Sequence, residues 1–178
     1  MSYFFVDVEA DGPCPGLYSM VSFGAVKFDD KLETTFYGTT RPITDNFIPG
    51  ALSVSCPSRE VHRSYDNPAD VMQDFNEWVI ENNTGSRPIF MSDNPAFDWQ
   101  WINYYFHNYV GSNPFGYSAR RIGDIYCGTV GNMRAKWKHL RKTVHDHHPV
   151  NDAMGNAEAF KVIQEMMREV KTLRKEKL

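Results

Sequence analysis

Residues 3–9 read Tyr3-Phe4-Phe5-Val6-Asp7-Val8-Glu9 and alternate between two faces. Asp7 and Glu9 fall on one face, and Phe4, Val6 and Val8 fall on the other. Since successive side chains of a β-strand point to opposite sides, this alternation predicts a strand that carries two acids on one side. The Cα atoms of the two acids are expected to lie about 7 Å apart, so that both carboxylates face the same space.

The pattern outward from this strand predicts an α/β domain with a mixed sheet. Further strands are predicted over residues 18–28, 32–38, 88–91 and 118–125. Helices are predicted over residues 71–79 and 153–170, and from Asn94 onward with Asn94 as the N-cap. Residues 42–68 are expected to be irregular, and residues 171–178 to form a frayed tail. The length of the chain fits a single domain over residues 1–178.

The composition is typical of a soluble, globular protein. Hydrophobic residues make up 42% of the 178 residues and charged residues 23%. The apolar runs are too short to span a bilayer, and the first residues lack the basic region of a signal peptide, so we expect no membrane contact. Cys14, Cys56 and Cys127 are odd in number and widely separated, which argues against a disulfide framework and favours a reducing cytoplasm.

Charge is distributed unevenly along the chain. The formal net charge is −3, so the protein as a whole is not a basic nucleic-acid binder. From Arg120 to Lys142, however, seven Arg and Lys residues accompany a single acid, Asp124. Such a patch can hold a polyanion, and it is equally typical of a solvated helix face. The sequence leaves both readings open.

The acid pair Asp7 and Glu9 is a candidate metal site. Two carboxylates on an apolar strand repel each other and lose hydration, and a cation between them relieves both costs. Taken alone, an Asp-x-Glu pattern at the end of a strand is more often a solvated edge.

Two later motifs place further candidates at the starts of helices. Asp98 falls in the first turn of the helix that begins after Asn94, where the helix dipole alone also favours an acid. His147 precedes Asp152 by five residues at the start of the last helix, so the histidine can lie above the site that Asp152 helps to form. A plain surface histidine is the competing interpretation, because this stretch is rich in histidine.

The order and setting of these motifs resemble a known family. The chain is similar to the DEDD exonuclease superfamily, in the branch that has histidine in its third motif and includes ribonuclease T, oligoribonuclease and the proofreading subunit of bacterial DNA polymerase. The residues that carry the resemblance are Asp7-x-Glu9, Asn94-x-x-x-Asp98 and His147-x-x-x-x-Asp152. It extends from Tyr3 to about Met167. The other branch has Tyr four residues before the last Asp, where this chain has His148.

The resemblance implies a fold and an activity. The fold would be a ribonuclease H-like mixed five-stranded sheet flanked by helices. The activity would be metal-dependent hydrolysis of single-stranded nucleic acid from its 3′ end to nucleoside 5′-monophosphates, by a homodimer. Asp7, Glu9, Asp98 and Asp152 would bind two Mg²⁺ or Mn²⁺ ions, since oxygen ligands suit hard cations. His147 would act as general base.

The resemblance also implies substrate contacts, and it leaves the substrate open. Ala10, Asp11 and Asn94 are the expected substrate-binding residues, although Ala10-Asp11 stands where the family commonly has small or hydroxyl residues near the terminal nucleotide. A domain of this size with no attached polymerase favours RNA over DNA. The alternatives are a DNA exonuclease, a scaffold that binds nucleic acid or a partner without cutting it, and a phosphodiesterase for small molecules.

Overall fold

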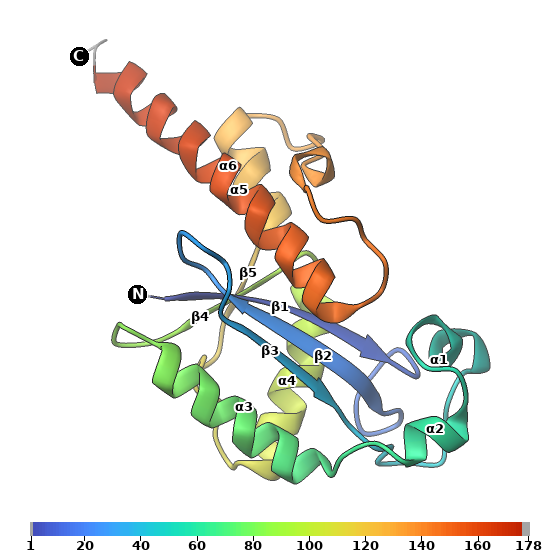
Figure 1. Ribbon diagram of the computed structural model, residues 1–178. Coiled ribbons are helices and arrows are strands. Elements are labelled where there is room, and N and C mark those ends of the chain that lie inside the picture. The colour runs from blue at the N-terminus through green and yellow to red at the C-terminus, as the bar shows by residue number, and fades with distance from the viewer. Residues whose placement is uncertain (1, 176–178) are drawn as a thin grey trace.

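The fold is organised around one five-stranded mixed sheet, seen in a computed structural model that describes residues 2–175 (Figure 1). The strands are β1 (Tyr3–Ala10), β2 (Met20–Lys27), β3 (Thr35–Thr39), β4 (Ile89–Ser92) and β5 (Ala119–Arg121), in the spatial order β3-β2-β1-β4-β5. The central strand β1 pairs antiparallel with β2 and parallel with β4, and β4 pairs parallel with β5. The predicted α/β fold with a mixed five-stranded, ribonuclease H-like sheet flanked by helices is confirmed.

Helices cover both faces of the sheet. They are α1 (Pro49–Ser55), α2 (Arg59–Arg63), α3 (Pro68–Asn82), α4 (Pro95–Tyr109), α5 (Ile122–Val130) and α6 (Pro149–Lys175), with a short 3₁₀ helix, η1 (Lys138–Leu140). The Phe4, Val6 and Val8 face of β1 packs in one core with α3 and α4. On the opposite face, Phe5 packs in a second core with residues of α5 and α6. The alternation of β1 therefore divides the core as the sequence predicts, and Asp7 and Glu9 lie on the α6 side.

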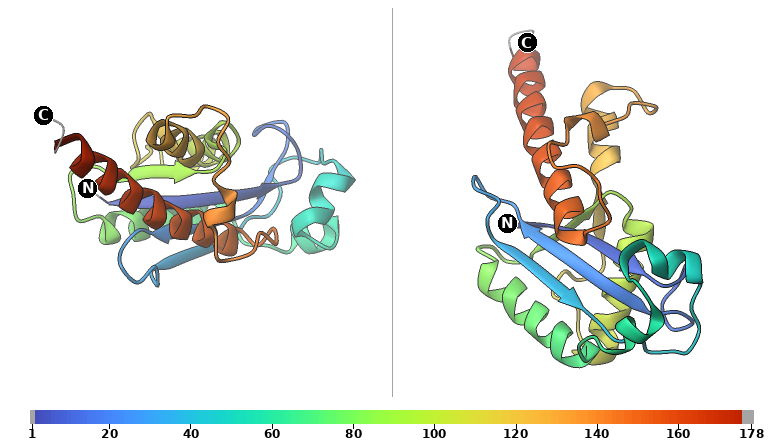
Figure 2. Two further views of the ribbon diagram at one scale, coloured as in Figure 1. Left: turned by 90° about the horizontal axis from the view of Figure 1, so that it is seen from above. Right: turned by 45° about the vertical axis from the view of Figure 1, so that its right-hand side comes forward.

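The first turn of α6 rests directly on the sheet at Gly24. Gly24 lies on β2 opposite Asp7 in the register of the two strands. A Cβ atom at Gly24 would overlap the backbone of Pro149 and Val150, the first residues of α6. Figure 2 shows α6 starting against the sheet while its C-terminal end projects beyond the other elements. The missing side chain thus brings the start of α6 beside the acids of β1.

The structure corrects two of the sequence-based expectations. Of the strand expected over residues 118–125, only residues 119–121 form a strand, β5, because α5 begins at Ile122. Ile122 and Tyr126 lie about one helical turn apart in α5 and pack in one core with residues of α6. Residues 42–68 are not wholly irregular, since they contain α1 and α2. In the basic patch 120–142, for which a solvated helix face is one of two interpretations, residues 134–142 contain only η1.

The last helix is longer than expected. It runs to Lys175 and so includes residues 171–175 of the segment for which a frayed tail is predicted, while residues 176–178 lie outside the described residues. Within the described range, no helix has both the length and the apolar character needed to cross a membrane.

A Gly24→Ala variant tests the close approach of α6. The added methyl group must displace Pro149 and Val150, and overpacking of this kind costs about 1–3 kcal/mol of stability. We expect a lower melting temperature and a loss of any activity that depends on the start of α6. The control is Gly128→Ala in α5, where an added Cβ meets nothing within 4 Å and should leave the melting temperature unchanged or raised. Equal behaviour of the two variants in thermal denaturation would contradict the account.

Candidate active site

Four acids from three elements converge at the end of β1. Asp7 and Glu9 come from β1, and Asp152 comes from the first turn of α6; one carboxylate oxygen of each lies within 4.8 Å of the others. Asp98, in the first turn of α4, is buried, and its Oδ1 accepts a hydrogen bond of 3.2 Å from the backbone N–H of Val8. That bond fixes Asp98 to the strand segment between the first two acids. The structure thus brings together all four acids expected from the sequence.

Three of the four acids have raised pKa values, and burial is the largest cause of each. Burial, followed by the negative charges of Asp98, Asp152 and Glu9, raises the pKa of Asp7 well above its ordinary value. Burial and the charge of Asp152 raise the pKa of Glu9 to about 7. Burial raises the pKa of Asp98 to about 7. Without a cation, the site therefore retains protons near neutral pH, because the carboxylates are poorly hydrated and lie close to one another.

The donor set fits hard divalent cations. Closely spaced carboxylate oxygens are the ligands that Mg²⁺ and Mn²⁺ prefer. The side chain of Asp152 is only 1% exposed, and its Oδ2 has the ring of His145 as its contact, with Nδ1 at 2.6 Å. Burial removes this carboxylate from water, and a cation would compensate for the lost hydration.

Arg141 holds the other oxygen of Asp152. Its Nη2 donates to Asp152 Oδ1 at 2.9 Å and to the Asp152 backbone carbonyl at 3.1 Å. Gly155, one turn later in α6, leaves the room that the guanidinium occupies, because a Cβ atom there would overlap Arg141. The sequence points to Arg141 only as part of a basic stretch that could bind phosphates, and nothing local in the sequence reveals its bond to Asp152.

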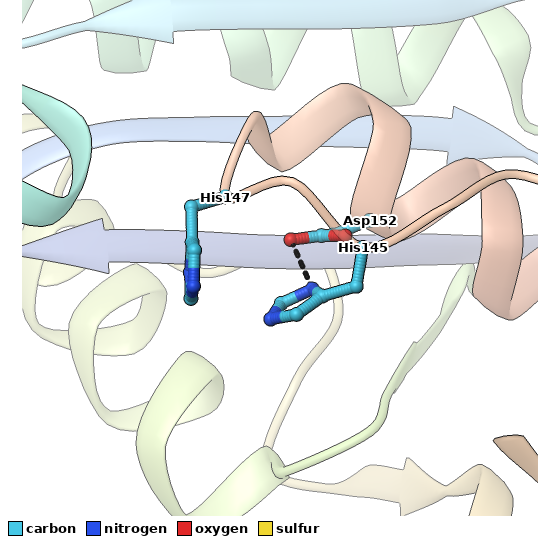
Figure 3. Close-up of side chains that lie close together, drawn as sticks. All are labelled: His145, His147 and Asp152. Atoms are coloured by element: carbon cyan, nitrogen blue, oxygen red, sulfur yellow. Dashed lines mark ion pairs between the residues drawn. The ribbon is translucent and has the colours of Figure 1, made fainter.

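The loop before α6 carries two histidines to the site (Figure 3). His147 has a φ of 62°, and its Nδ1 lies 3.5 Å from Glu9 Oε1. The Nδ1 atom of His145 lies 2.6 Å from Asp152 Oδ2. The ring of His148 turns to Tyr37 instead and stacks on it at a centroid distance of 5.0 Å. The sequence reveals His145 only as one histidine among several, so its place beside Asp152 is a structural finding.

The three expected substrate-binding residues have different surroundings. Ala10 is buried at the end of β1. The carboxylate of Asp11 is fully buried, pairs with Arg59 at 2.6 Å and accepts the Ser19 N–H at 2.6 Å. The Asp11 side chain therefore fastens α2 to the end of β1 and is not presented to a substrate. Asn94 is exposed at the N-cap of α4, and its side chain makes no capping hydrogen bond.

A basic groove adjoins the start of α4. It has a volume of about 560 Å³ and runs from Asp93 and Asn94 past α5 to the loop that precedes η1. The basic residues in its lining are Arg121, Arg134, Lys136 and Lys138. Lys138 pairs with Asp93 at 2.8 Å, whereas Arg134 and Lys136 form no ion pair within the described part of the chain. Those two cations remain available to an anionic ligand.

Comparisons with known proteins agree with this geometry. The family model described as the 3′-5′ exoribonuclease Rv2179c-like domain matches residues 2–164. The chain is also 38% identical, over 182 aligned residues, to the Escherichia coli protein named 3′-5′ DNA exonuclease Cap18, and the alignment covers 93% of each chain.

Two solved structures share the fold. Cell-death related nuclease 4 (CRN-4) has a TM-score of 0.74 and 13% identity over 93% of this chain. Escherichia coli Exonuclease I in complex with a dT13 oligonucleotide has a TM-score of 0.73 and 15% identity over 97% of this chain. The chain spans 64% of the length of CRN-4 and 43% of that of Exonuclease I.

The raised pKa values predict how the stability of the metal-free protein depends on pH. A carboxyl whose pKa is higher in the folded than in the unfolded protein stabilises the fold at low pH, and this stabilisation is lost as pH rises through the folded-state value. Glu9 and Asp98 have folded-state values of about 7. In the presence of a chelator, the melting temperature should therefore fall as the pH is raised from about 5 to about 8.

An Asp7→Asn variant should reduce the loss of stability, because Asp7 has a raised pKa of its own and the amide that replaces it does not ionise. At pH 8 we expect the metal-free variant to melt higher than the parent, and Mg²⁺ or Mn²⁺ to raise the melting temperature of the parent more than that of the variant. Asp45→Asn is the control, since the Asp45 side chain is fully exposed. Identical pH profiles for parent and Asp7→Asn, with no effect of cations, would contradict the electrostatic account.

Proposed function

Because this chain belongs to the family of Rv2179c-like 3′-5′ exoribonuclease domains and is a DEDD-type 3′-5′ exonuclease, we propose that it removes nucleotides from the 3′ end of single-stranded nucleic acid and releases nucleoside 5′-monophosphates. The observation that carries the proposal is the convergence of Asp7, Glu9 and Asp152, with Asp98 bound to the same strand. A scaffold that does not cut has no need of four converging acids, two of them buried, because their repulsion and lost hydration lower stability.

Cations form part of this proposal. Asp7, Glu9, Asp98 and Asp152 would hold two Mg²⁺ or Mn²⁺ ions, for which carboxylate oxygens are suitable ligands. When bound, such ions stabilise the negative charge that develops on the phosphate and on its leaving oxygen. The bond from Arg141 fixes the position of Asp152 and leaves Oδ2 directed into the site.

His147 is the proposed general base. It lies on an exposed loop beside Glu9, where an imidazole can take a proton from an attacking water and pass it to solvent. Hydrogen bonds fasten both ends of this loop: Thr143 N–H donates to Glu158 Oε2 at 2.7 Å, and Asn151 Nδ2 donates to Asp146 Oδ2 at 2.8 Å. The proton acceptor is thus held next to the acids by the same helix that supplies Asp152.

RNA is the substrate that the family description supports, and DNA is the second candidate. The family model is named for exoribonucleases, whereas the Escherichia coli relative is named a DNA exonuclease, and solved complexes of Exonuclease I contain DNA oligonucleotides. The acids act on phosphate, which the two polymers share, so the choice depends on contacts to the ribose 2′-hydroxyl.

The groove beside α4 offers a path for the strand. Arg134 and Lys136 line it, and Asn94 lies both in its lining and in the turn that precedes Asp98. We propose that phosphates upstream of the 3′ end bind there. Arg141, in contrast, is bound to Asp152 and is not one of these contacts.

Two proposals from the sequence remain predictions. The homodimer expected from the resemblance would be contradicted by a sedimentation mass of one chain, 20.5 kDa. The cytoplasmic location would be checked by fractionation of the native host. The three cysteines are free in the structure, which is compatible with a reducing compartment.

Matched oligonucleotides test the proposed function. Single-stranded RNA and DNA of one sequence, each with a free or a blocked 3′ end, are incubated with Mg²⁺ or with a chelator. We expect 5′-monophosphates from free ends only, only with the cation, and faster from RNA. Faster release from DNA would select the second candidate. Cleavage inside a strand with a blocked 3′ end, or no cleavage of any strand, would reject the proposal.

His147→Ala tests the general base. Loss of the base should lower turnover by roughly 10²–10⁴-fold, with little change in folding or in the binding of Mg²⁺ or Mn²⁺. His148→Ala is the matched control, because His148 is in the same loop but stacks on Tyr37. If His148→Ala is the impaired variant and His147→Ala is normal, the motif has been read in the wrong register.

The double variant Arg134→Glu and Lys136→Glu tests the groove. These side chains would bind substrate and transition state alike, so reversing their charge should raise KM more than it lowers kcat. The control is Lys31→Glu with Lys171→Glu, which changes the net charge equally at exposed positions outside the groove. Equal kinetics for the two double variants would show that the groove is only a solvated surface.

A further inference from the structure

Two imidazoles and a carboxylate meet at the edge of the acidic site (Figure 3). One ligand atom each from His145, His147 and Asp152 lies within 4.8 Å of the other two. The rings of the two histidines are 4.4 Å apart at their centroids. Both histidines are 49% exposed, so an ion can reach them from solvent, whereas Asp152 is 1% exposed.

The surroundings of this trio indicate a built site. Asp152 Oδ2 is buried, and the Nδ1 atom of His145 lies 2.6 Å from it. His147 has a left-handed backbone conformation, which is uncommon for a residue other than glycine. Asp146, between the two histidines, accepts hydrogen bonds from the His148 N–H and from Asn151. The loop is therefore held in a conformation that keeps one nitrogen of each ring within 4.8 Å of an Asp152 carboxylate oxygen.

The donor atoms differ in kind from those of the four acids. Mg²⁺ prefers oxygen ligands, whereas imidazole nitrogen with one carboxylate suits Zn²⁺ and related transition-metal ions. Three protein ligands with an open fourth position are a common arrangement for Zn²⁺. We propose that His145, His147 and Asp152 form a second cation site, which takes Zn²⁺ or a similar transition-metal ion and whose occupation stops hydrolysis.

Inhibition follows from the shared residues. Asp152 also belongs to the proposed Mg²⁺ site, and a His147 nitrogen that binds a metal has no lone pair with which to accept a proton. The two states therefore exclude each other. This part of the inference rests on the proposed function, whereas the binding of Zn²⁺ does not.

A simpler interpretation is that His145 only forms a hydrogen bond or ion pair with Asp152 and orients it. In that case His145→Ala would disturb the Mg²⁺-supported reaction and leave Zn²⁺ binding unchanged. Under the proposal, His145→Ala loses Zn²⁺ binding and retains Mg²⁺-supported turnover.

The direct test measures binding without nucleic acid. Metal-free protein is titrated with Zn²⁺ by calorimetry, and with Co²⁺ by visible absorption, which reports nitrogen ligands and low coordination number. We expect His145→Ala to weaken Zn²⁺ binding by at least the roughly 10–100-fold that loss of an outer-shell partner costs. His148→Ala, a histidine three positions away that faces Tyr37, should bind as the parent does. Equal affinities for the parent and His145→Ala would overturn the inference.

The second arm measures cleavage in constant Mg²⁺ with increasing Zn²⁺. The parent and His148→Ala should be inhibited at low Zn²⁺, and His145→Ala only at much higher concentrations. Binding that depends on His145 without cleavage under any condition would reject the proposed function and leave the cation site standing. Cleavage that Zn²⁺ inhibits equally in the parent and in His145→Ala would reject the site and leave the function standing.

Discussion

The close approach of α6 to the sheet at Gly24 is the constraint on which the site depends. Without a side chain at Gly24, the backbone of Pro149 and Val150 lies against β2 directly opposite Asp7. That contact places Asp152 beside the acids of β1 and aligns the histidine loop with them. The resulting repulsion between buried carboxylates lowers the stability of the metal-free fold, which is typical of functional sites and is relieved by cations.

The sequence predicts the parts of the structure that depend on short-range patterns. The alternation in β1 predicts both the division of the core and the shared face of Asp7 and Glu9, because a period of two residues needs no knowledge of partners. The five-residue spacing of His147 and Asp152 likewise predicts a histidine just before the last helix and an acid in its first turn, as α6, which begins at Pro149, has them. That these separate segments come together at one site is implied by the family resemblance and not by the spacing of the residues.

The residues that the sequence does not reveal act through long-range contacts. In the sequence, Arg141 is one of several cations in a basic stretch. In the structure, its guanidinium donates a hydrogen bond to Asp152 and packs against Gly155. The family resemblance predicts that Asp11 binds substrate. In the structure, its carboxylate forms an ion pair with Arg59, which lies in a region expected to be irregular. In both cases the partner is far enough away along the chain that only the fold brings the charges together.

The chemistry of the site also explains why relatives named for RNA and for DNA coexist around one fold. In the proposed mechanism the acids and His147 act on a phosphate and a water, which are the same in both polymers, so these residues can be retained while the sugar preference changes. Substrate choice is then a property of the segments around the acids, such as the end of β1 and the groove beside α4.

The central claim is that the converged acids form a cation site. Its most direct test is anomalous X-ray scattering from crystals of the protein soaked with Mn²⁺, together with a nucleoside 5′-monophosphate. The account predicts two peaks, each bounded by carboxylate oxygens from the set Asp7, Glu9, Asp98 and Asp152. A crystal with no Mn²⁺ peak among these four residues, or with Mn²⁺ bound only elsewhere on the chain, would contradict it.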